Sequence, residues 1–309
     1  MNTFFIATKS VLPLFLVMFV GIVMIRIKAA NESWIDILNK YVLWLGFPAM
    51  IFSALAKLDF SVGEYTSLIL FNSIYLVVCI LLTFPVSFIF KTSVKTKRTL
   101  LLLLAFGNVS YLGIPVLISA YGNEVIGTAV MISAVYLFWM FTLALILIEI
   151  TGHEKVRIGI LLKKLAMNPL LIAVILGITA SYLKVKLDSS VMKTVDLFGQ
   201  SVTAIVLFSL GLFLGSQKIG SKKEWLPVLL LTLAIMVVIP GIFFLILRSS
   251  NLTHIQLQAS VLEAAMPMGL TAYALAHQHN LNTILAGRLV VLSTIFAVVI
   301  LPAWMVFTA

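Results

Sequence analysis

Two stretches of the sequence place proline and glycine beside polar side chains in the middle of an apolar run. Proline removes a backbone N–H group and glycine permits non-helical backbone, so each stretch is expected to break a membrane helix. Half-helix N-termini meeting inside the bilayer would suit a carboxylate, because they offer N–H groups and positive dipole ends. The alternative is that the prolines only kink packed helices. The residues predicted to bind an anion are Asn108, Ser110, Tyr111, Gly113 and Pro115 in the first stretch and Met266, Pro267 and Thr271 in the second.

Asn108 is the strongest candidate for direct contact with an anion, because its amide group offers both donors and an acceptor. The alternative is an interhelical hydrogen bond, which is a common use of Asn in membranes. The hydroxyl groups of Ser110, Tyr111 and Thr271 could add contacts, although such residues also serve in helix packing.

Glu263 and Arg288 are the candidates for ion coupling. Glu263 stands about ten residues into its apolar run, which at about 1.5 Å per residue places it near the middle of the bilayer. A carboxyl group there favours its neutral form, which makes Glu263 a candidate proton carrier. Arg288, about 8 Å inside the membrane face, could pair with Glu263 or attract the anion. The alternative for both residues is a buried structural ion pair.

Patterns typical of enzymes are missing from the sequence. There is no Ser/His/Asp arrangement and no His-Glu-x-x-His pattern, and residues 107–113 lack the Lys of a phosphate-binding loop. We therefore expect a protein that is not an enzyme and that has no metal site or other cofactor, with proton or sodium coupling left open.

The chain that carries these residues is mostly apolar. Of its 309 residues 62% are hydrophobic and 10% are charged, whereas about a quarter of the residues of soluble domains are charged. A membrane helix needs about 20 apolar residues to cross about 30 Å of hydrocarbon. The sequence predicts an all-α membrane protein with ten spans, at approximately 10–27, 35–57, 65–90, 99–120, 124–150, 168–183, 195–216, 225–248, 254–277 and 283–307.

Matching prolines indicate an internal repeat, which is typical of secondary transporters. The pairs are Pro13 and Pro169, 156 residues apart, Pro85 and Pro240, 155 apart, and Pro115 and Pro267, 152 apart. We expect a first five-helix repeat in residues 1–151, a short linker at 152–167 and a second repeat in residues 168–309. Because five is an odd number of spans, the second repeat would be inverted relative to the first.

The distribution of basic residues predicts the orientation of the chain, whose net charge is +10. Six Lys and Arg residues fall on one side of the predicted spans and thirteen on the other, which should be cytoplasmic. Both termini would then lie outside the cytoplasm, in a multi-pass protein of the cell (inner) membrane. No basic patch is interleaved with aromatic residues, which argues against a nucleic-acid partner.

The sequence resembles the auxin efflux carrier family, which includes bacterial malate- or malonate-type permeases and the plant PIN auxin exporters. The resemblance covers essentially the whole chain. It is carried by Leu45–Ala49, Phe52–Leu55, Gly107-Asn108, Gly113-Ile114-Pro115, Tyr121-Gly122, Leu207–Leu212 and Ala265-Met266-Pro267.

The resemblance implies two inverted five-helix repeats in which spans four and nine are broken and cross at their prolines. It implies a scaffold of spans 1, 2, 6 and 7 that forms a homodimer, and a transport domain of spans 3–5 and 8–10 that moves like an elevator. It also implies that Asn108 contacts the carboxylate of a small organic-acid substrate, such as a mono- or dicarboxylate or an auxin-like acid.

Three alternatives to an organic-anion carrier stay open. A sodium-coupled symporter or a cation/proton antiporter of similar fold would also use crossing helices, although an antiporter usually needs paired carboxylates and only Glu263 is present. A membrane sensor that binds an anion without moving it belongs to a different class of protein.

Overall fold

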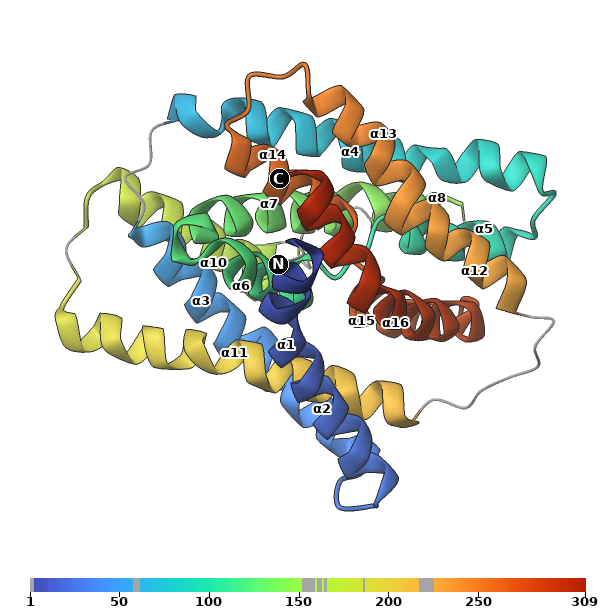
Figure 1. The fold of residues 1–309 in the computed structure, drawn as a ribbon, viewed down its shortest axis with the longest axis horizontal. Coiled ribbons are helices and arrows are strands. Elements are labelled where there is room, and N and C mark those ends of the chain that lie inside the picture. The colour runs from blue at the N-terminus through green and yellow to red at the C-terminus, as the bar shows by residue number, and fades with distance from the viewer. Residues whose placement is uncertain are drawn as a thin grey trace.

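The computed structural model describes residues 3–57, 62–151, 159, 163, 166–185, 187–216 and 225–309, which fold almost entirely into helices (Figure 1). Within these residues no strand forms, and the one β-type contact is an isolated antiparallel bridge between Gly107 and Met268. The α-helices are α1 (Thr3–Arg26), α2 (Glu32–Tyr41), α3 (Phe47–Ala56), α4 (Val62–Ile89), α5 (Val94–Leu103), α6 (Ile114–Tyr121), α7 (Ile126–Trp139), α8 (Leu145–Ile150), α10 (Pro169–Tyr182), α11 (Ser189–Ser216), α12 (Trp225–Leu233), α13 (Ile239–Leu247), α14 (His254–Ala264), α15 (Leu270–Gln278) and α16 (Thr283–Phe307).

Short π-helical turns join several of these helices end to end. They are η1 (Val42–Gly46), η2 (Val109–Gly113), η4 (Met140–Ala144) and η6 (Ala234–Val238), and a 3₁₀ turn, η3 (Asn123–Val125), precedes α7. Through these turns α2 and α3, α7 and α8, and α12 and α13 each continue as one long helix. Helices occur in all ten of the predicted apolar runs.

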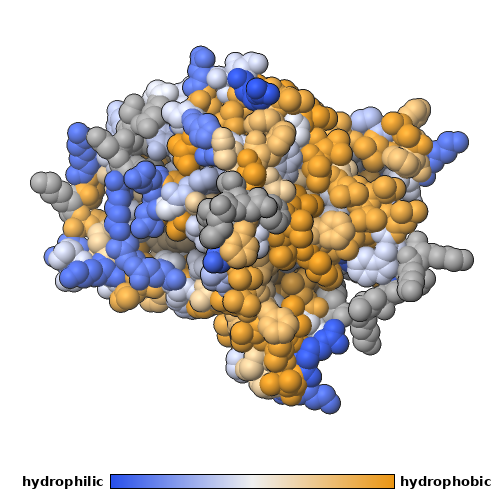
Figure 2. All heavy atoms as spheres, in the orientation of Figure 1, coloured by the Kyte–Doolittle hydropathy of each residue, from blue (hydrophilic) through white to orange (hydrophobic). Residues whose placement is uncertain are grey.

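Six helical stretches in the described part of the chain are long and apolar enough to cross a membrane. They are Glu32–Ala56, Tyr65–Ile89, Asn123–Ile148, Ser189–Ser216, Trp225–Leu247 and Thr283–Phe307. Hydrophobic residues cover most of the middle of the face in Figure 2, and hydrophilic residues gather at its edges. Helices that are apolar on their outer faces as well as inside are typical of a membrane protein. The chain is therefore an all-α, multi-pass protein, whereas its ten-span inverted-repeat topology stays a prediction.

The helix contacts form two main groups, and α1 also packs against α16 across them. In the first group α1 lies along α11, and α3 packs against α10 and α11. The crossing of α1 and α11 depends on Gly211, since a β-carbon there would collide with the backbone of Met18; small residues permit such close approach in membranes. In the second group α4 packs on α7, α14 on α7 and α13, and α16 on α12 and α15.

The family resemblance implies a division of these helices into scaffold and transport domain, and this division stays a prediction. We refer to α1, α2, α3, α10 and α11 as the first helix group and to the remaining helices as the second. The predicted linker, residues 152–167, lies largely outside the described residues.

Two helical paths in the second group are interrupted and cross each other. The first is interrupted between the end of α5 and the start of η2, and the second between α14 and α15. The crossing segments are joined by backbone hydrogen bonds from the Asn108 N–H to the Pro267 carbonyl (2.7 Å) and from the Gly269 N–H to the Phe106 carbonyl (2.9 Å). These hydrogen bonds between the two segments pair backbone groups that a broken helix would otherwise leave without partners in the bilayer.

The expectation that both helices break is confirmed, but the position expected for Pro115 was wrong. Pro267 lies within its break, whereas Pro115 lies in the first turn of α6, after the break and after η2. The π-helical turn η2 precedes this proline, and the helix that η2 and α6 form continues through Pro115 instead of breaking at it. Gly107, in the isolated bridge, marks the true interruption.

Candidate functional site

A cavity of about 370 Å³ lies where the crossing segments face the first helix group. Its walls are the segments around Asn108 and Gly269 on one side and α2, η1 and α10 on the other. A volume in this range is typical of small-molecule sites. The lining residues of the second helix group that carry the argument are Phe106, Asn108, Ser110, Tyr111, Gly269 and Thr271.

Both half-helices that follow the breaks start at this cavity. The helix formed by η2 and α6 begins at Val109, and α15 begins at Leu270; both residues line the cavity. The first N–H groups of a helix have no intrahelical acceptor, and the helix dipole adds positive potential at that end. Two such ends on one cavity make it suited to an anion without any buried cation.

Asn108 and Ser110 bring buried polar atoms to the same place. Asn108 is 3% exposed and Ser110 is 4% exposed. Neither the Asn108 Oδ1 atom nor the Ser110 Oγ atom has a hydrogen-bonding partner among the described residues. Buried side-chain polar atoms in folded proteins are nearly always bonded. An amide oxygen and a hydroxyl group without partners beside a cavity are therefore suited to a polar ligand.

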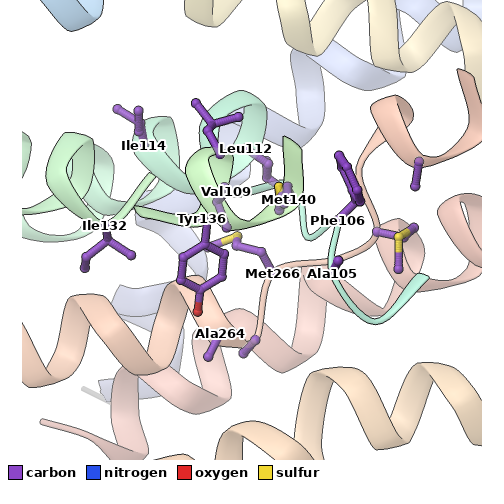
Figure 3. Close-up of a cluster of buried hydrophobic side chains, with 14 of the residues drawn as sticks. Ala105, Phe106, Val109, Leu112, Ile114, Ile132, Tyr136, Met140, Ala264 and Met266 are labelled. Atoms are coloured by element: carbon purple, nitrogen blue, oxygen red, sulfur yellow. The ribbon is translucent and has the colours of Figure 1, made fainter. Parts of the chain in front are cut away.

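Glu263 lies behind the cavity, inside the crossing. It is 1% exposed, and neither of its carboxylate oxygens has a hydrogen-bonding partner among the described residues. Its carboxyl group is packed against Gly113, where a β-carbon would overlap it unless the carboxyl group moved. The hydroxyl group of Tyr75 donates to the Ala264 carbonyl next to it (3.2 Å), and Figure 3 shows the ring of Tyr136 directed toward the same end of α14.

The predicted anion-binding residues divide into two sets. Asn108, Ser110, Tyr111 and Thr271 line the cavity. The other four support the crossing from behind: Gly113 contacts Glu263, the Pro267 carbonyl accepts a hydrogen bond from Asn108, Pro115 is buried in the first turn of α6, and Met266 is fully buried among apolar side chains (Figure 3).

Arg288 and Glu263 are not brought together. Arg288 lines a different cavity, and its guanidinium carbon lies 5.8 Å from the centre of the Trp225 ring. The ion pair considered from the sequence is therefore not formed in this structure.

Three polar residues at the cavity were missed in the sequence. Asp36, Asn39 and Lys40 of α2 line it from the first helix group, and the Asn39 Oδ1 atom accepts a hydrogen bond from Ser209 (2.9 Å). Their spacing of three and four residues places them on one face of α2. That spacing was the available signal, but the position of α2 against the crossing follows only from tertiary packing.

Comparison with known proteins agrees with the architecture. A protein family described as "Membrane transport protein" matches residues 6–305. An uncharacterized transporter of Methanocaldococcus jannaschii is 23% identical over 286 residues, which cover 89% of this chain and 90% of its own. A Rhizobium meliloti protein named "Putative malonate transporter" is 22% identical and covers 94% of this chain and 92% of its own.

A third relative is the uncharacterized transporter YfdV of Escherichia coli, which is 23% identical over 98% of both chains. The family match extends over nearly the whole length of the sequence and includes both crossing segments. The chain therefore belongs to this membrane transport protein family, as its resemblance to the auxin efflux carriers led us to expect.

Proposed function

We propose that the protein is a secondary active transporter for a small organic anion, a mono- or dicarboxylate or an auxin-like acid. The observation that carries the proposal is the convergence of two half-helix N-termini on one cavity that also holds the amide group of Asn108 and the partnerless hydroxyl group of Ser110, both of which can donate to a carboxylate. In this proposal the N–H groups of Val109–Tyr111 and Leu270–Thr271 hold a carboxylate, and Asn108 fixes its orientation.

Charged residues of α2 complete the proposed site. Lys40 and Asp36 are exposed and line the cavity one helical turn apart. Lys40 would attract the substrate or bind a second carboxylate, whereas Asp36 would weaken binding of strongly charged anions. The name of the R. meliloti relative supports a dicarboxylate such as malonate as one substrate to test.

A second cavity, of about 650 Å³, supports an alternating-access mechanism. It lies between α3, α6, α7 and α11 and is lined by polar residues that include Ser53, Lys57, Asp196 and Gln200. The rings of Phe47 and Tyr111 touch edge to face, with their centres 4.7 Å apart. Both residues lie between the two cavities, because the residues just before them in the sequence line the first cavity and the residues just after them line the second. Movement of the second helix group past the first, like an elevator, would break this contact and transfer the site between the cavities.

Glu263 is the proposed coupling residue. A carboxyl group without a partner, buried beside the crossing, favours protonation unless a cation binds with it. Proton binding at Glu263 could thus be linked to the position of the crossing. Arg288 lines a different cavity, beside Trp225, and is therefore not proposed to take part in proton coupling with Glu263.

The predicted topology and assembly are part of the proposal. Both termini lie outside the cytoplasm in the cell (inner) membrane, since the charge distribution favours a cytoplasmic linker. A homodimer formed by the first helix group follows from the family resemblance.

Flux through proteoliposomes made from the purified protein tests the proposal. Uptake of radiolabelled malonate, malate or lactate is measured with an imposed pH gradient, with and without sodium. We expect saturable uptake that the pH gradient drives. Binding without flux would indicate a sensor, and uptake that strictly requires sodium would indicate a sodium symporter.

A further inference from the structure

A third cavity, of about 300 Å³, brings together two arginines that are far apart in the sequence. Arg26 is the last residue of α1, and Arg288 lies in the second turn of α16. Trp225, Tyr273 and Thr283 share this cavity. It contains none of the residues that line the proposed carboxylate site.

The chemistry of this cavity suits a phosphate group. The Arg288 guanidinium carbon stands 5.8 Å from the centre of the Trp225 ring, within the range of a cation–π contact, and a guanidinium group carries N–H donors around its edge. Two guanidinium groups can each present a pair of donors, and the hydroxyl groups of Tyr273 and Thr283 add further donors. Several donors from different directions match the oxygens of a phosphate better than the two oxygens of one carboxylate.

The ends of three helices place the cavity at a membrane boundary. Arg26 ends α1, Trp225 begins α12 and Thr283 begins α16, and all three residues line the cavity. Arg and Trp are both characteristic of the layer where lipid headgroups lie.

An apolar strip continues from the cavity along α16. Ile284 and Ile295 line the cavity and are 64% and 56% exposed, which is typical of side chains that face lipid tails. The two residues are about 16 Å apart along the helix axis at about 1.5 Å per residue. A polar, doubly cationic end and a long apolar edge fit a phospholipid, whose phosphate would lie at the arginines and whose acyl chain would lie along α16.

We propose that this cavity binds the phosphate group of an anionic phospholipid. Basic pockets between membrane helices are suited to such headgroups, since each nearby Lys or Arg adds attraction to an anionic lipid. The site joins Arg26 of the first helix group to Arg288 and Trp225 of the second. If the helix groups move as proposed above, a bound lipid would restrain that movement; this consequence alone rests on the proposed function.

The test is lipid-dependent thermal stabilisation of the full-length protein, purified in detergent and stripped of lipid. The probes are phosphatidylglycerol, phosphatidylcholine and inorganic phosphate, and the variants are Arg26→Gln and Arg288→Gln. Arg248→Gln is the matched control, since Arg248 also stands over an aromatic ring, 5.9 Å from the centre of Phe244, but does not line this cavity. Arg26 is exposed at a helix end, so its variant keeps the test valid if Arg288→Gln fails to fold.

We expect phosphatidylglycerol to raise the melting temperature of the wild type and of Arg248→Gln, with phosphatidylcholine giving a much smaller rise. Each cavity variant should need about fivefold more phosphatidylglycerol for the same rise. Equal responses in all variants, or equal responses to the two lipids, would overturn the site. If inorganic phosphate stabilises the protein and the effect depends on the two arginines, the proposal that the bound phosphate belongs to a lipid would be wrong. The ligand would then be a soluble phosphate compound.

Discussion

The carboxyl group of Glu263 lies directly against Gly113, at a point where a β-carbon would overlap it. One residue comes from α14 and the other from η2, so this contact fixes the two broken helices against each other. A larger residue at position 113 would require the Glu263 carboxyl group to move.

Substitution of Gly113 by Ala should therefore destabilise the crossing. Overpacking of this kind costs about 1–3 kcal/mol, which a lowered melting temperature in detergent would show. The control is Gly63→Ala, because a β-carbon at Gly63 meets no atom within 4 Å. In a double-mutant cycle, the loss caused by Gly113→Ala should shrink when Glu263 is already Ala. Additive losses would show that the methyl group added at position 113 does not meet the Glu263 side chain.

Glu263→Gln should uncouple the transporter from the proton gradient. Gln keeps the size that fits against Gly113 but cannot bind and release a proton. Accumulation driven by a pH gradient should be lost while exchange of labelled for unlabelled substrate continues. Glu32→Gln, at an exposed acid in the first turn of α2, serves as the control. Unaltered pH dependence in the Glu263 variant would remove the assignment.

Lys40 and Asp36 should have opposite effects on substrate affinity. Both side chains are exposed at the cavity. Two unit charges about 4 Å apart in water interact by about 1 kcal/mol, so each side chain should change the affinity for a charged substrate about fivefold. Lys40→Gln should raise KM and Asp36→Asn should lower it. Both changes should shrink at high salt, which screens exposed charges. Changes of the same sign in both variants would contradict an electrostatic role.

A covalent link between Phe47 and Tyr111 should stop transport. Their rings touch across the two helix groups, so cysteines at both positions, with the buried Cys79 replaced by Ala, can be joined by a short thiol-reactive cross-linker. The double-cysteine protein should lose on cross-linking the flux that it shows before treatment, and cleavage of a reducible cross-linker should restore that flux. Full flux in the cross-linked protein would mean that the helix groups do not move at this contact.

The sequence was sufficient to predict an all-helical membrane protein and the two interrupted helices. Long apolar runs determine the first, and the clusters of glycine and proline indicated the second, although only Gly107, Pro267 and Gly269 lie at the interruptions themselves. Asn108 and Thr271 were also predicted at a common site, because each stands beside an interruption and both half-helices start there.

Other features depend on packing that no local pattern encodes. Pro115 and Pro267 have similar surroundings in the sequence, yet Pro115 lies inside a continuous helix, just after a π-helical turn, whereas Pro267 lies in a break. Arg288 was considered as a partner of Glu263 from its depth, but the rotation of α16 directs it to Trp225. The polar face of α2 becomes part of the site only because α2 lies against the crossing.

The most direct test of the account is ligand-dependent thermal stabilisation of the wild type and Asn108→Ala, measured with malonate, malate, lactate, citrate, indole-3-acetate and sodium. At about 100 times Kd a ligand stabilises the folded state by about 2.7 kcal/mol, which is readily detected. Asn72→Ala is the control, because Asn72 is also buried but donates to Ser260 between helices (2.9 Å). We predict that at least one carboxylate stabilises the wild type and Asn72→Ala but not Asn108→Ala. An equal shift in Asn108→Ala, or a shift with sodium alone, would contradict an organic-anion site at the crossing.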